Sequence, residues 1–394
     1  MIRKRQLTET GLLIPDCKKF TGYKPCEPFK NCETCETPEP IGTHILLINL
    51  DALGDVLVTT AILPALKRKY PVSTVRWLTK SYAIPLLENN PFLDEVLAWN
   101  GDNRLILQQM QFDLALNADK NRNSSAFIQT LQAARKMGFG LNAFGAIVPL
   151  TAEADYNYRM GIDDRLKFYD NTRTGQEILA ETFGLDYKRD EYVLELTAEE
   201  KKASITFRRN LGIADKELVL GFNTGCSVRF PNKKLTVQQH VDLIRRLHAA
   251  FPDVKMILLG GPEDTLRNRE IKQKVGELVL ETPTNEGLRR GILYENMADV
   301  VVTGDSLGMH VAIALKKWVL AWFGPTSPQE IDLYGRGEKI TSRAPCAPCW
   351  NPRCPTGTLE CIYNLDLNRF VEAFGRFYTE WWQSGKWLRR GRNA

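Results

Sequence analysis

Short apolar runs that alternate with helical segments constrain this sequence more than any other feature. The run 44–50 is followed by apolar positions at helical spacing over 56–69. The same order returns later, where the run 218–223 precedes a helix start marked by Thr236 and Gln239. Strands that alternate with helices form a parallel sheet covered by helices. The sequence therefore predicts an α/β protein in which two Rossmann-like domains face a cleft. The further strands that we expect are 74–79, 95–99, 112–118, 255–261, 299–304 and 318–324.

The length of the chain also favours two domains, because 394 residues exceed what one hydrophobic core normally supports. A polar stretch rich in proline and cysteine precedes the first apolar run. The stretch 151–200 is more charged and irregular, and we interpret it as a helical insertion with the interdomain connection. The expected divisions are a Cys-rich extension (1–40), a first Rossmann-like domain (41–205), a second Rossmann-like domain (206–365) and a C-terminal helix (366–394).

Composition excludes several classes of protein. Hydrophobic residues make up 43% and charged residues 25%, which is typical of a soluble globular protein. A net charge of +5 is too small for a dedicated nucleic-acid binder, so no nucleic-acid partner is expected. No signal peptide is visible, and no apolar stretch reaches the roughly 18–20 residues of a membrane span. We therefore expect a cytoplasmic protein.

The first strand ends in an unusual junction, Asp51-Ala-Leu-Gly54-Asp55. Open α/β folds bind their ligands at the carboxyl ends of the strands, which is where this junction falls. Asp55 lies at the expected first turn of a helix, so it suits two roles. It can cap the helix and complement its dipole. It can also act as a general base that removes a proton from an acceptor hydroxyl.

Two motifs in the second half also follow predicted strands. Thr224 and Gly225 precede a loop with Lys233 and Lys234, and small residues beside cations suit a phosphate leaving group. The alternative is a solvated basic loop. The segment 300–315 forms a second strand-to-helix junction, whose backbone amides attract phosphate.

Within that second junction, Gly308 is expected to keep the first helical turn open to a ligand. Asp305 is expected to orient a loop or bind a sugar hydroxyl, since its charge does not favour phosphate. Ser306 and His310 share a helix face, although His310 also suits a core position. Together with Asp55, these motifs predict a transferase in which one domain holds a nucleotide sugar and the other presents the nucleophile.

Eight of the nine cysteines fall into two sets, and in a reducing compartment clustered thiols more often bind metal than form disulfides. Each set can form a closed structural site, for which zinc is the default metal. The alternatives are reduced free thiols or one disulfide. The early set is Cys17, Cys26, Cys32 and Cys35, and the late set is Cys346, Cys349, Cys354 and Cys361.

Over about residues 44–365 the chain resembles glycosyltransferase family 9, the ADP-heptose heptosyltransferases. The resemblance lies in LLINLDALGDVLVTTAILPALKRKYP, FNTGCSVRFPNKKLT, LLGGPED, GDSLGMHVAIAL and LAWFGPTSP, which follow in the family's order. It implies a GT-B fold and an inverting transfer of heptose from ADP-heptose without a catalytic metal. The acceptor would be a hydroxyl of a bacterial glycan, as in lipopolysaccharide core biosynthesis, or of a protein.

The resemblance also implies roles for particular residues. Asp55 matches the family's catalytic aspartate, and Lys233 matches its diphosphate-binding lysine. Asp119, at the end of another first-domain strand, is a second candidate for the base. Leu307 stands where the family usually has glycine. The implied donor-binding residues are Thr224, Gly225, Lys233, Asp305, Ser306, Leu307, Gly308 and His310.

The cysteines and the DSLGMH motif look closer to a divergent branch that includes the autotransporter heptosyltransferases, which modify proteins. That likeness makes iron a second choice of metal for the two sets. The expected partners are a nucleotide-sugar donor, a glycan or protein acceptor and a possible second copy of the chain. The alternatives to a heptosyltransferase are a metal-stapled assembly scaffold and a transferase of another nucleotide sugar. A nicotinamide oxidoreductase is disfavoured because no predicted strand is followed by G-x-G-x-x-G.

The C-terminal segment carries aromatic residues along one helical face. We expect this helix to pack across the first domain, as it does in GT-B folds. The alternative is a peripheral membrane-surface anchor with basic residues on lipid phosphates. The aromatic face comprises Phe370, Phe374, Phe377, Trp381 and Trp382, and the anchor would add Trp387, Arg389, Arg390 and Arg392.

Overall fold

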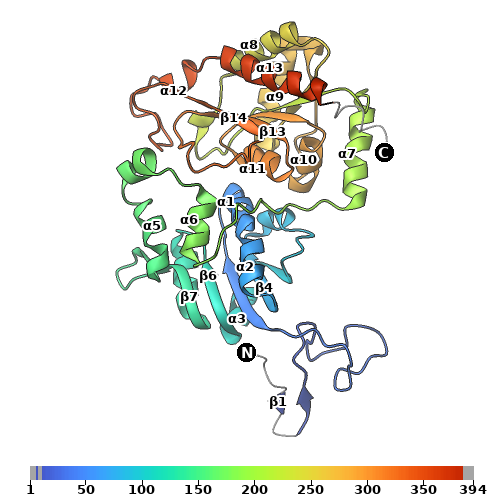
Figure 1. Ribbon diagram of the computed structural model, residues 1–394, viewed down its shortest axis with the longest axis vertical. Coiled ribbons are helices and arrows are strands. Elements are labelled where there is room, and N and C mark those ends of the chain that lie inside the picture. The colour runs from blue at the N-terminus through green and yellow to red at the C-terminus, as the bar shows by residue number, and fades with distance from the viewer. Residues whose placement is uncertain (1–5, 8–10, 385–394) are drawn as a thin grey trace. The chain divides into compact units, whose positions relative to one another are not determined.

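The structure is a computed structural model that describes residues 6–7 and 11–384 (Figure 1). The chain divides into two compact units. The first comprises the residues up to Ile84, Asn90–Ile162 and Gln176–Asp190. The second comprises Pro85–Asn89, Asp163–Gly175 and the described residues from Glu191 onward. A short antiparallel pair, β1 (Gln6–Leu7) and β2 (Leu13–Ile14), belongs to the first unit.

The first unit contains a six-stranded sheet in the order β5-β4-β3-β6-β7-β8. All neighbours are parallel except β7 and β8, which are antiparallel. Ile48 pairs with Leu78 on one side and with Asn117 on the other, so these three strands end at one edge. The strands are β3 (Thr43–Ile48), β4 (Ser73–Thr79), β5 (Glu95–Ala98), β6 (Gln111–Asn117), β7 (Gln132–Leu141) and β8 (Ile147–Pro149).

The second unit repeats this plan with the order β11-β10-β9-β12-β13-β14, and all its neighbours are parallel. Asn223 pairs with Leu259 and with Thr303, which again places three strand ends at one edge. The strands are β9 (Val219–Asn223), β10 (Lys255–Leu259), β11 (Leu280–Glu281), β12 (Val300–Gly304), β13 (Trp318–Phe323) and β14 (Gly337–Thr341).

Both sheets have the Rossmann strand order, third-second-first-fourth-fifth-sixth. The prediction of an α/β protein with two Rossmann-like domains is therefore confirmed, and every predicted apolar run contains a strand. Sequence reasoning missed β7, β8, β11 and β14. These strands lie toward the sheet edges, where a strand needs less apolar sequence because one face or one side remains in water.

Helices connect the strands, and short helices occupy part of the stretch 151–200, in which 183–197 has no helix or strand. The predicted helix over 56–69 is interrupted, because Pro64 has no N–H to donate and a 3₁₀ turn, Thr60–Ile62, separates its two halves. The helices are α1 (Leu53–Thr59), α2 (Leu63–Lys69), α3 (Gly101–Gln109), α4 (Arg122–Thr130), α5 (Asp155–Arg159), α6 (Gly175–Thr182), α7 (Ala198–Asn210), α8 (Val237–Ala250), α9 (Thr265–Val275), α10 (Leu288–Glu295), α11 (Leu307–Ala314), α12 (Glu360–Tyr363) and α13 (Asn368–Gln383).

The C-terminal helix α13 packs in the second unit, beside α8, β13 and β14 (Figure 1). Its residues Phe370, Phe374 and Trp381 are buried in the same core cluster as Leu243 and Leu247 of α8. The expectation that this helix covers the first domain was wrong. The aromatic face of α13 is buried instead by α8 and by β13 and β14 of the second unit.

The membrane-anchor alternative needs exposed aromatic residues on α13. Trp381 is buried in this core, and of the aromatic face only Trp382 is substantially exposed. Trp387, Arg389, Arg390 and Arg392 lie outside the described residues. Within residues 6–7 and 11–384, no helix has both the length and the apolar composition that crossing a bilayer requires.

Phe374→Ala is expected to lower the free energy of unfolding of the second unit by about 3–5 kcal/mol, because it opens a cavity at a fully buried ring. Urea unfolding followed by tryptophan fluorescence measures this loss. The matched control is Trp382→Ala on the same helix, whose side chain is 43% exposed and should cost far less. Equal losses for the two variants would contradict the packing of α13.

Candidate active site

The strand order reverses between β3 and β6 in the first sheet and between β9 and β12 in the second. Loops that leave neighbouring strands in opposite directions at such a point open a crevice at the carboxyl edge. Asp55 follows β3 and Asp119 follows β6. Lys233 follows β9 and Asp305 follows β12. Each predicted site residue of the two sheets therefore comes from a strand that flanks a reversal.

Asp119 lies buried at the edge of the first sheet, with 5% of its surface exposed. Its Oδ2 accepts a hydrogen bond from the Leu50 backbone N–H at 2.5 Å, which fixes the start of the junction. Burial raises the pKa of Asp119 well above its usual value, and the negative charges of Asp55 and Asp51 raise it further. These effects favour the protonated form of Asp119.

Asp55 is exposed at the start of α1. Its Oδ2 accepts a hydrogen bond from the Ala52 backbone N–H at 3.2 Å, which is the capping contact expected for a carboxylate at this position. Asn49 donates to the backbone carbonyl of Asp55 and to Thr59 Oγ1, so two hydrogen bonds join the end of β3 to α1. Asp55 therefore caps the helix, and its side chain remains exposed to solvent.

The third carboxylate of this edge is Asp51, whose Oδ1 accepts a hydrogen bond from the hydroxyl of Tyr82. Tyr82 is exposed and comes from a different loop, after β4. Sequence reasoning missed Tyr82, because nothing near it in the chain marks it as a partner of the junction. The edge of the first sheet thus carries two accessible carboxylates beside a buried one.

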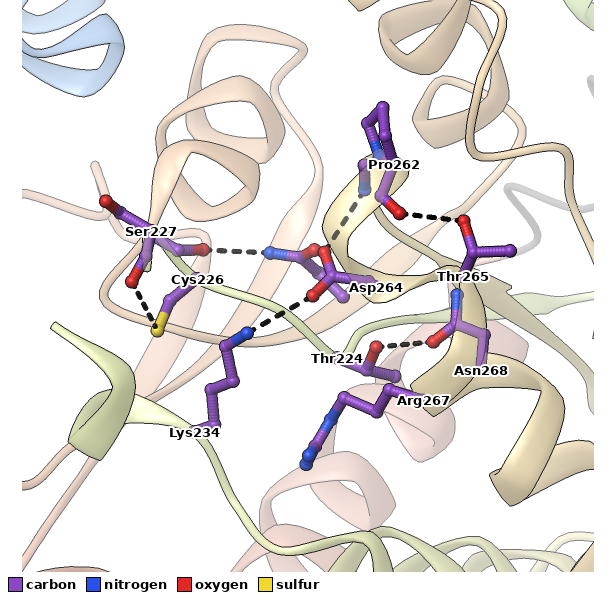
Figure 2. Close-up of polar contacts among 12 residues, drawn as sticks. Thr224, Cys226, Ser227, Lys234, Pro262, Asp264, Thr265, Arg267 and Asn268 are labelled. Atoms are coloured by element: carbon purple, nitrogen blue, oxygen red, sulfur yellow. Dashed lines mark hydrogen bonds and ion pairs between the residues drawn. The ribbon is translucent and has the colours of Figure 1, made fainter. Parts of the chain in front are cut away.

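The loop after β9 is held against the start of α9, as Figure 2 shows. Thr224 donates from its hydroxyl to Asn268 Oδ1. A side chain at Gly225 is impossible without movement, since an added Cβ would stand 1.9 Å from Asp264 Oδ2. The sequence analysis explained the small residue by a phosphate ligand. The structure shows a second reason, because the Asp264 carboxylate occupies the space that a side chain would need.

Asp264 also forms an ion pair with Lys234 of the same loop (Figure 2), with Lys234 Nζ 3.4 Å from Asp264 Oδ1. Burial raises the pKa of Asp264, while the Gly261 backbone N–H and the charge of Lys234 act against that rise. Burial likewise raises the pKa of the Cys226 thiol, which donates to the Phe230 carbonyl at 3.0 Å. Cys226 and Lys234 therefore maintain the loop.

Lys233 points the other way, into an ion pair with Asp305 whose Nζ–Oδ2 distance is 2.9 Å. Both side chains are largely buried. Burial alone would raise the pKa of Asp305, but the charge of Lys233 and the hydrogen bonds from Lys233 and Thr326 hold it below its usual value. The backbone carbonyl of Lys233 also accepts a hydrogen bond from Trp322 Nε1 at 2.8 Å, which fixes the residue. The alternative of a solvated basic loop is wrong for Lys233.

Ser306 and Gly308 lie at the start of α11, where Asn223 of β9 reaches them. Asn223 Nδ2 donates to Ser306 Oγ at 2.8 Å and to Thr303 Oγ1 at 3.0 Å. A Cβ at Gly308 would stand 2.2 Å from Asn223 Nδ2, so Gly308 makes room for this amide. Sequence reasoning explained Gly308 by a ligand and did not give Asn223 a role. Leu307 is the first residue of the same helix and is partly buried.

His310 is buried behind Asp305, as the core alternative anticipated, with 7% exposure. Burial lowers the pKa of His310 to about 4, although the negative charge of Asp305 opposes the change. Its ring is therefore neutral near pH 7, and Nδ1 lies 3.3 Å from the Tyr192 hydroxyl. A neutral, buried imidazole carries no charge for a phosphate.

All nine cysteines are free thiols in the structure, so the one-disulfide alternative finds no support. The early set, Cys17, Cys26, Cys32 and Cys35, lines one small cavity of about 20 Å³. In the late set, burial and the neighbouring thiolates Cys346, Cys349 and Cys354 raise the pKa of Cys361 to about 11. Across the residues that the structure describes, no three His, Cys, Asp or Glu side chains are arranged to hold a metal ion. The thiols of each set gather, but not at ligating positions.

Asp119→Asn is expected to remove a pH dependence of stability. A carboxyl whose pKa is raised on folding keeps a proton that the unfolded chain releases, so stability is lost as pH rises above about 3.8. The loss is up to about 1.4 kcal/mol for each pH unit until the folded-state pKa is reached. Denaturant unfolding of both proteins between pH 4 and pH 8 measures the difference. Parallel curves would contradict it, and Asp186→Asn, at a side chain 83% exposed, is the matched control.

Comparisons with known proteins agree with this architecture. Residues 104–359 match the sequence family described as glycosyltransferase family 9 (heptosyltransferase). Lipopolysaccharide heptosyltransferase 1 of Campylobacter coli is 22% identical over 303 residues, which cover 72% of this chain and 84% of that protein.

Two solved structures have the same fold. The family 9 glycosyltransferase of Veillonella parvula superposes with a TM-score of 0.68 at 18% identity, over 86% of this chain and 98% of that one. The dodecameric, iron-containing heptosyltransferase TibC in complex with ADP-D-β-D-heptose, a protein of Escherichia coli, gives 0.53 at 9% identity, over 86% and 77%. The family match spans more than half of the chain, and the chain therefore belongs to glycosyltransferase family 9, the heptosyltransferases.

Proposed function

We propose that this glycosyltransferase moves a heptose from ADP-heptose to a hydroxyl of a bacterial surface glycan, such as a lipopolysaccharide core, or of a protein, with inversion at the anomeric carbon. The observation that carries the proposal is the pair of strand reversals. One bears an exposed carboxylate, Asp55, and the other bears the buried ion pair of Lys233 with Asp305. The names of the Campylobacter relative and of TibC support the sugar and the donor.

The second Rossmann-like domain is the proposed donor site. Lys233 would bind the diphosphate, because a diphosphate brings more negative charge to its ammonium than the single carboxylate of Asp305 does. Asp305, held ionised by Lys233, would accept hydrogen bonds from sugar hydroxyls. His310, neutral behind it, would fix its orientation. The remaining donor-site residues proposed are Thr224, Gly225, Ser306, Leu307 and Gly308.

The first Rossmann-like domain would present the acceptor. Asp55 takes the proton of the acceptor hydroxyl, and the oxygen attacks the anomeric carbon from the face opposite the diphosphate. The bond between that carbon and the phosphate oxygen breaks, and ADP leaves with its new charge neutralised by Lys233. No metal is needed in this step. Asp119 is the weaker candidate for the base, since its raised pKa favours a carboxyl that already holds a proton.

Asp119 would instead hold the turn Asp51–Asp55 in position. Its hydrogen bond from the Leu50 N–H holds the residue just before Asp51. A protonated carboxyl also spares the edge a third negative charge beside Asp51 and Asp55. The exposed Asp55 would thus carry the proton transfer, and the buried Asp119 would position the turn.

Asp55→Asn is expected to lower the turnover number by about 10²–10⁴-fold, because the amide cannot accept the proton. It should leave ADP binding unchanged and keep the cap, since its carbonyl oxygen can still accept from Ala52. Release of ADP from ADP-heptose in the presence of acceptor measures turnover, and calorimetry measures ADP binding. The matched control is Asp51→Asn, at the residue that precedes the N-cap of α1 in the same junction. Near-native turnover of Asp55→Asn would contradict the assignment and leave Asp119 as the base.

The proposal includes one structural zinc or iron ion for each cysteine set. Support comes from the four thiols around one cavity in the early set and the mutual electrostatic effect in the late set. TibC is described as iron-containing, although that likeness extends to the fold alone. A metal ion bound by four thiolates would cross-link each Cys-rich segment, which has few buried apolar residues to stabilise it. Ligation requires the thiols to move closer than they stand in this structure.

Elemental analysis of protein purified without chelator is expected to find about two zinc or iron ions per chain, one for each four-thiolate set. Cys346→Ser combined with Cys349→Ser should lower that content by about one. The matched control is Cys226→Ser, because Cys226 belongs to neither set and lies in the loop after β9. A wild-type protein without either metal would end this part of the proposal.

We also place the enzyme in the cytoplasm as a homo-oligomer. TibC is described as a dodecamer, which supports assembly in this family without fixing the number of subunits here.

A further inference from the structure

A tryptophan of the late cysteine loop lies beside the proposed phosphate lysine. The ring centroid of Trp350 is 5.3 Å from Lys233 Nζ and 4.2 Å from Lys167 Nζ. The ring of Phe230 lies 5.6 Å away, centroid to centroid, and Lys233 also stands 5.1 Å from that ring. Trp350 is 42% exposed, so part of the residue is accessible to a ligand.

Backbone contacts fix this position. The N–H groups of Cys349 and Trp350 both donate to the Pro325 carbonyl, at 3.1 and 2.8 Å, just after β13. Asn232, in the loop after β9, donates from its side chain to the Asn351 carbonyl at 2.7 Å. The segment that carries Trp350 is therefore attached on both sides to loops at the carboxyl edge of the second sheet.

Both lysines beside the Trp350 ring also form ion pairs. Lys233 is paired with Asp305, and Lys167 Nζ lies 3.6 Å from Glu330 Oε1. Each ammonium also lies over the negative face of the Trp350 ring, which attracts it. Two cations held beside one accessible aromatic face suit a ligand that joins an anionic group to an apolar surface.

Three different chemistries thus adjoin one another. Asp305 accepts hydrogen bonds, Lys233 binds an anion, and Trp350 offers a flat apolar face. A sugar attached to a phosphate presents the matching three, namely hydroxyl groups, negative charge and a face of C–H groups. A nucleobase would use the aromatic face but has no need of a carboxylate on the far side of the lysine.

We propose that Trp350 is a specificity-determining residue of the donor site and packs its indole against the apolar face of the transferred sugar. This inference rests on the proposed function and deepens it. It also gives the late cysteine loop a part in donor recognition, since Cys349 directly precedes Trp350 and shares its anchor at Pro325.

Trp350→Ala is expected to weaken binding of ADP-heptose about tenfold, and binding of ADP less than about threefold, by isothermal titration calorimetry. Trp350→Phe should restore most of the loss, because a smaller ring still offers an apolar face. The matched control is Trp382→Ala, at a tryptophan of equal exposure on α13, which should bind both ligands as the wild type does.

The outcomes separate this inference from the function on which it rests. Equal weakening of ADP and ADP-heptose would place the indole on the nucleotide and overturn the sugar contact. Unchanged binding of ADP-heptose to Trp350→Ala would overturn the inference while leaving the function intact. A wild-type protein that binds neither ligand would overturn the proposed function itself. Zinc and iron content and thermal unfolding of each variant establish that the late cysteine loop is still assembled.

Discussion

Everything that can act on a ligand in this protein depends on two pairings of parallel strands, β3 with β6 and β9 with β12. Parallel pairing brings the carboxyl ends of strands that are distant in the sequence to one edge, and the reversal of strand order keeps the loops between them apart. At the first reversal this constraint gathers three carboxylates, and at the second it gathers a lysine, a carboxylate and a histidine. Helix caps, tight glycines and loop hydrogen bonds hold these groups, but the sheets determine which groups meet.

Burial then decides which of the gathered groups carry charge. Asp119 and His310 are both buried, and in each case burial favours the neutral form, by raising the pKa of the acid and lowering that of the base. Asp305 is buried too, yet it stays ionised because Lys233 contacts it directly. One carboxyl is thus neutral and another charged within a single chain. The difference arises from the Lys233 ammonium, which lies 2.9 Å from the Asp305 carboxylate.

Sequence reasoning predicted the strands that carry the site and failed elsewhere for identifiable reasons. Asp55 and Asp119 were singled out because they closely follow apolar runs, and Lys233 was singled out as a cation in the loop after such a run. Gly308 was noticed, but its contact with Asn223 was not, since 85 residues separate the amide from the glycine that makes room for it. Trp350 was missed because only the thiols of the late cysteine motif around it were given a role, and Tyr82 was missed because it belongs to no motif. The partner of α13 was wrong, since an aromatic face signals burial without naming the surface that covers it.

The sequence by itself determined the two Rossmann-like sheets, the glycine and aspartate junctions at their edges and the family, because apolar periodicity and turn residues act locally along the chain. Only the tertiary structure decided the protonation of Asp119 and His310, the pairing of Lys233 with Asp305, and the approach of Trp350 to that pair. Each of these depends on distances between segments far apart in the chain and on the exclusion of water around them. No local pattern of residues encodes either quantity.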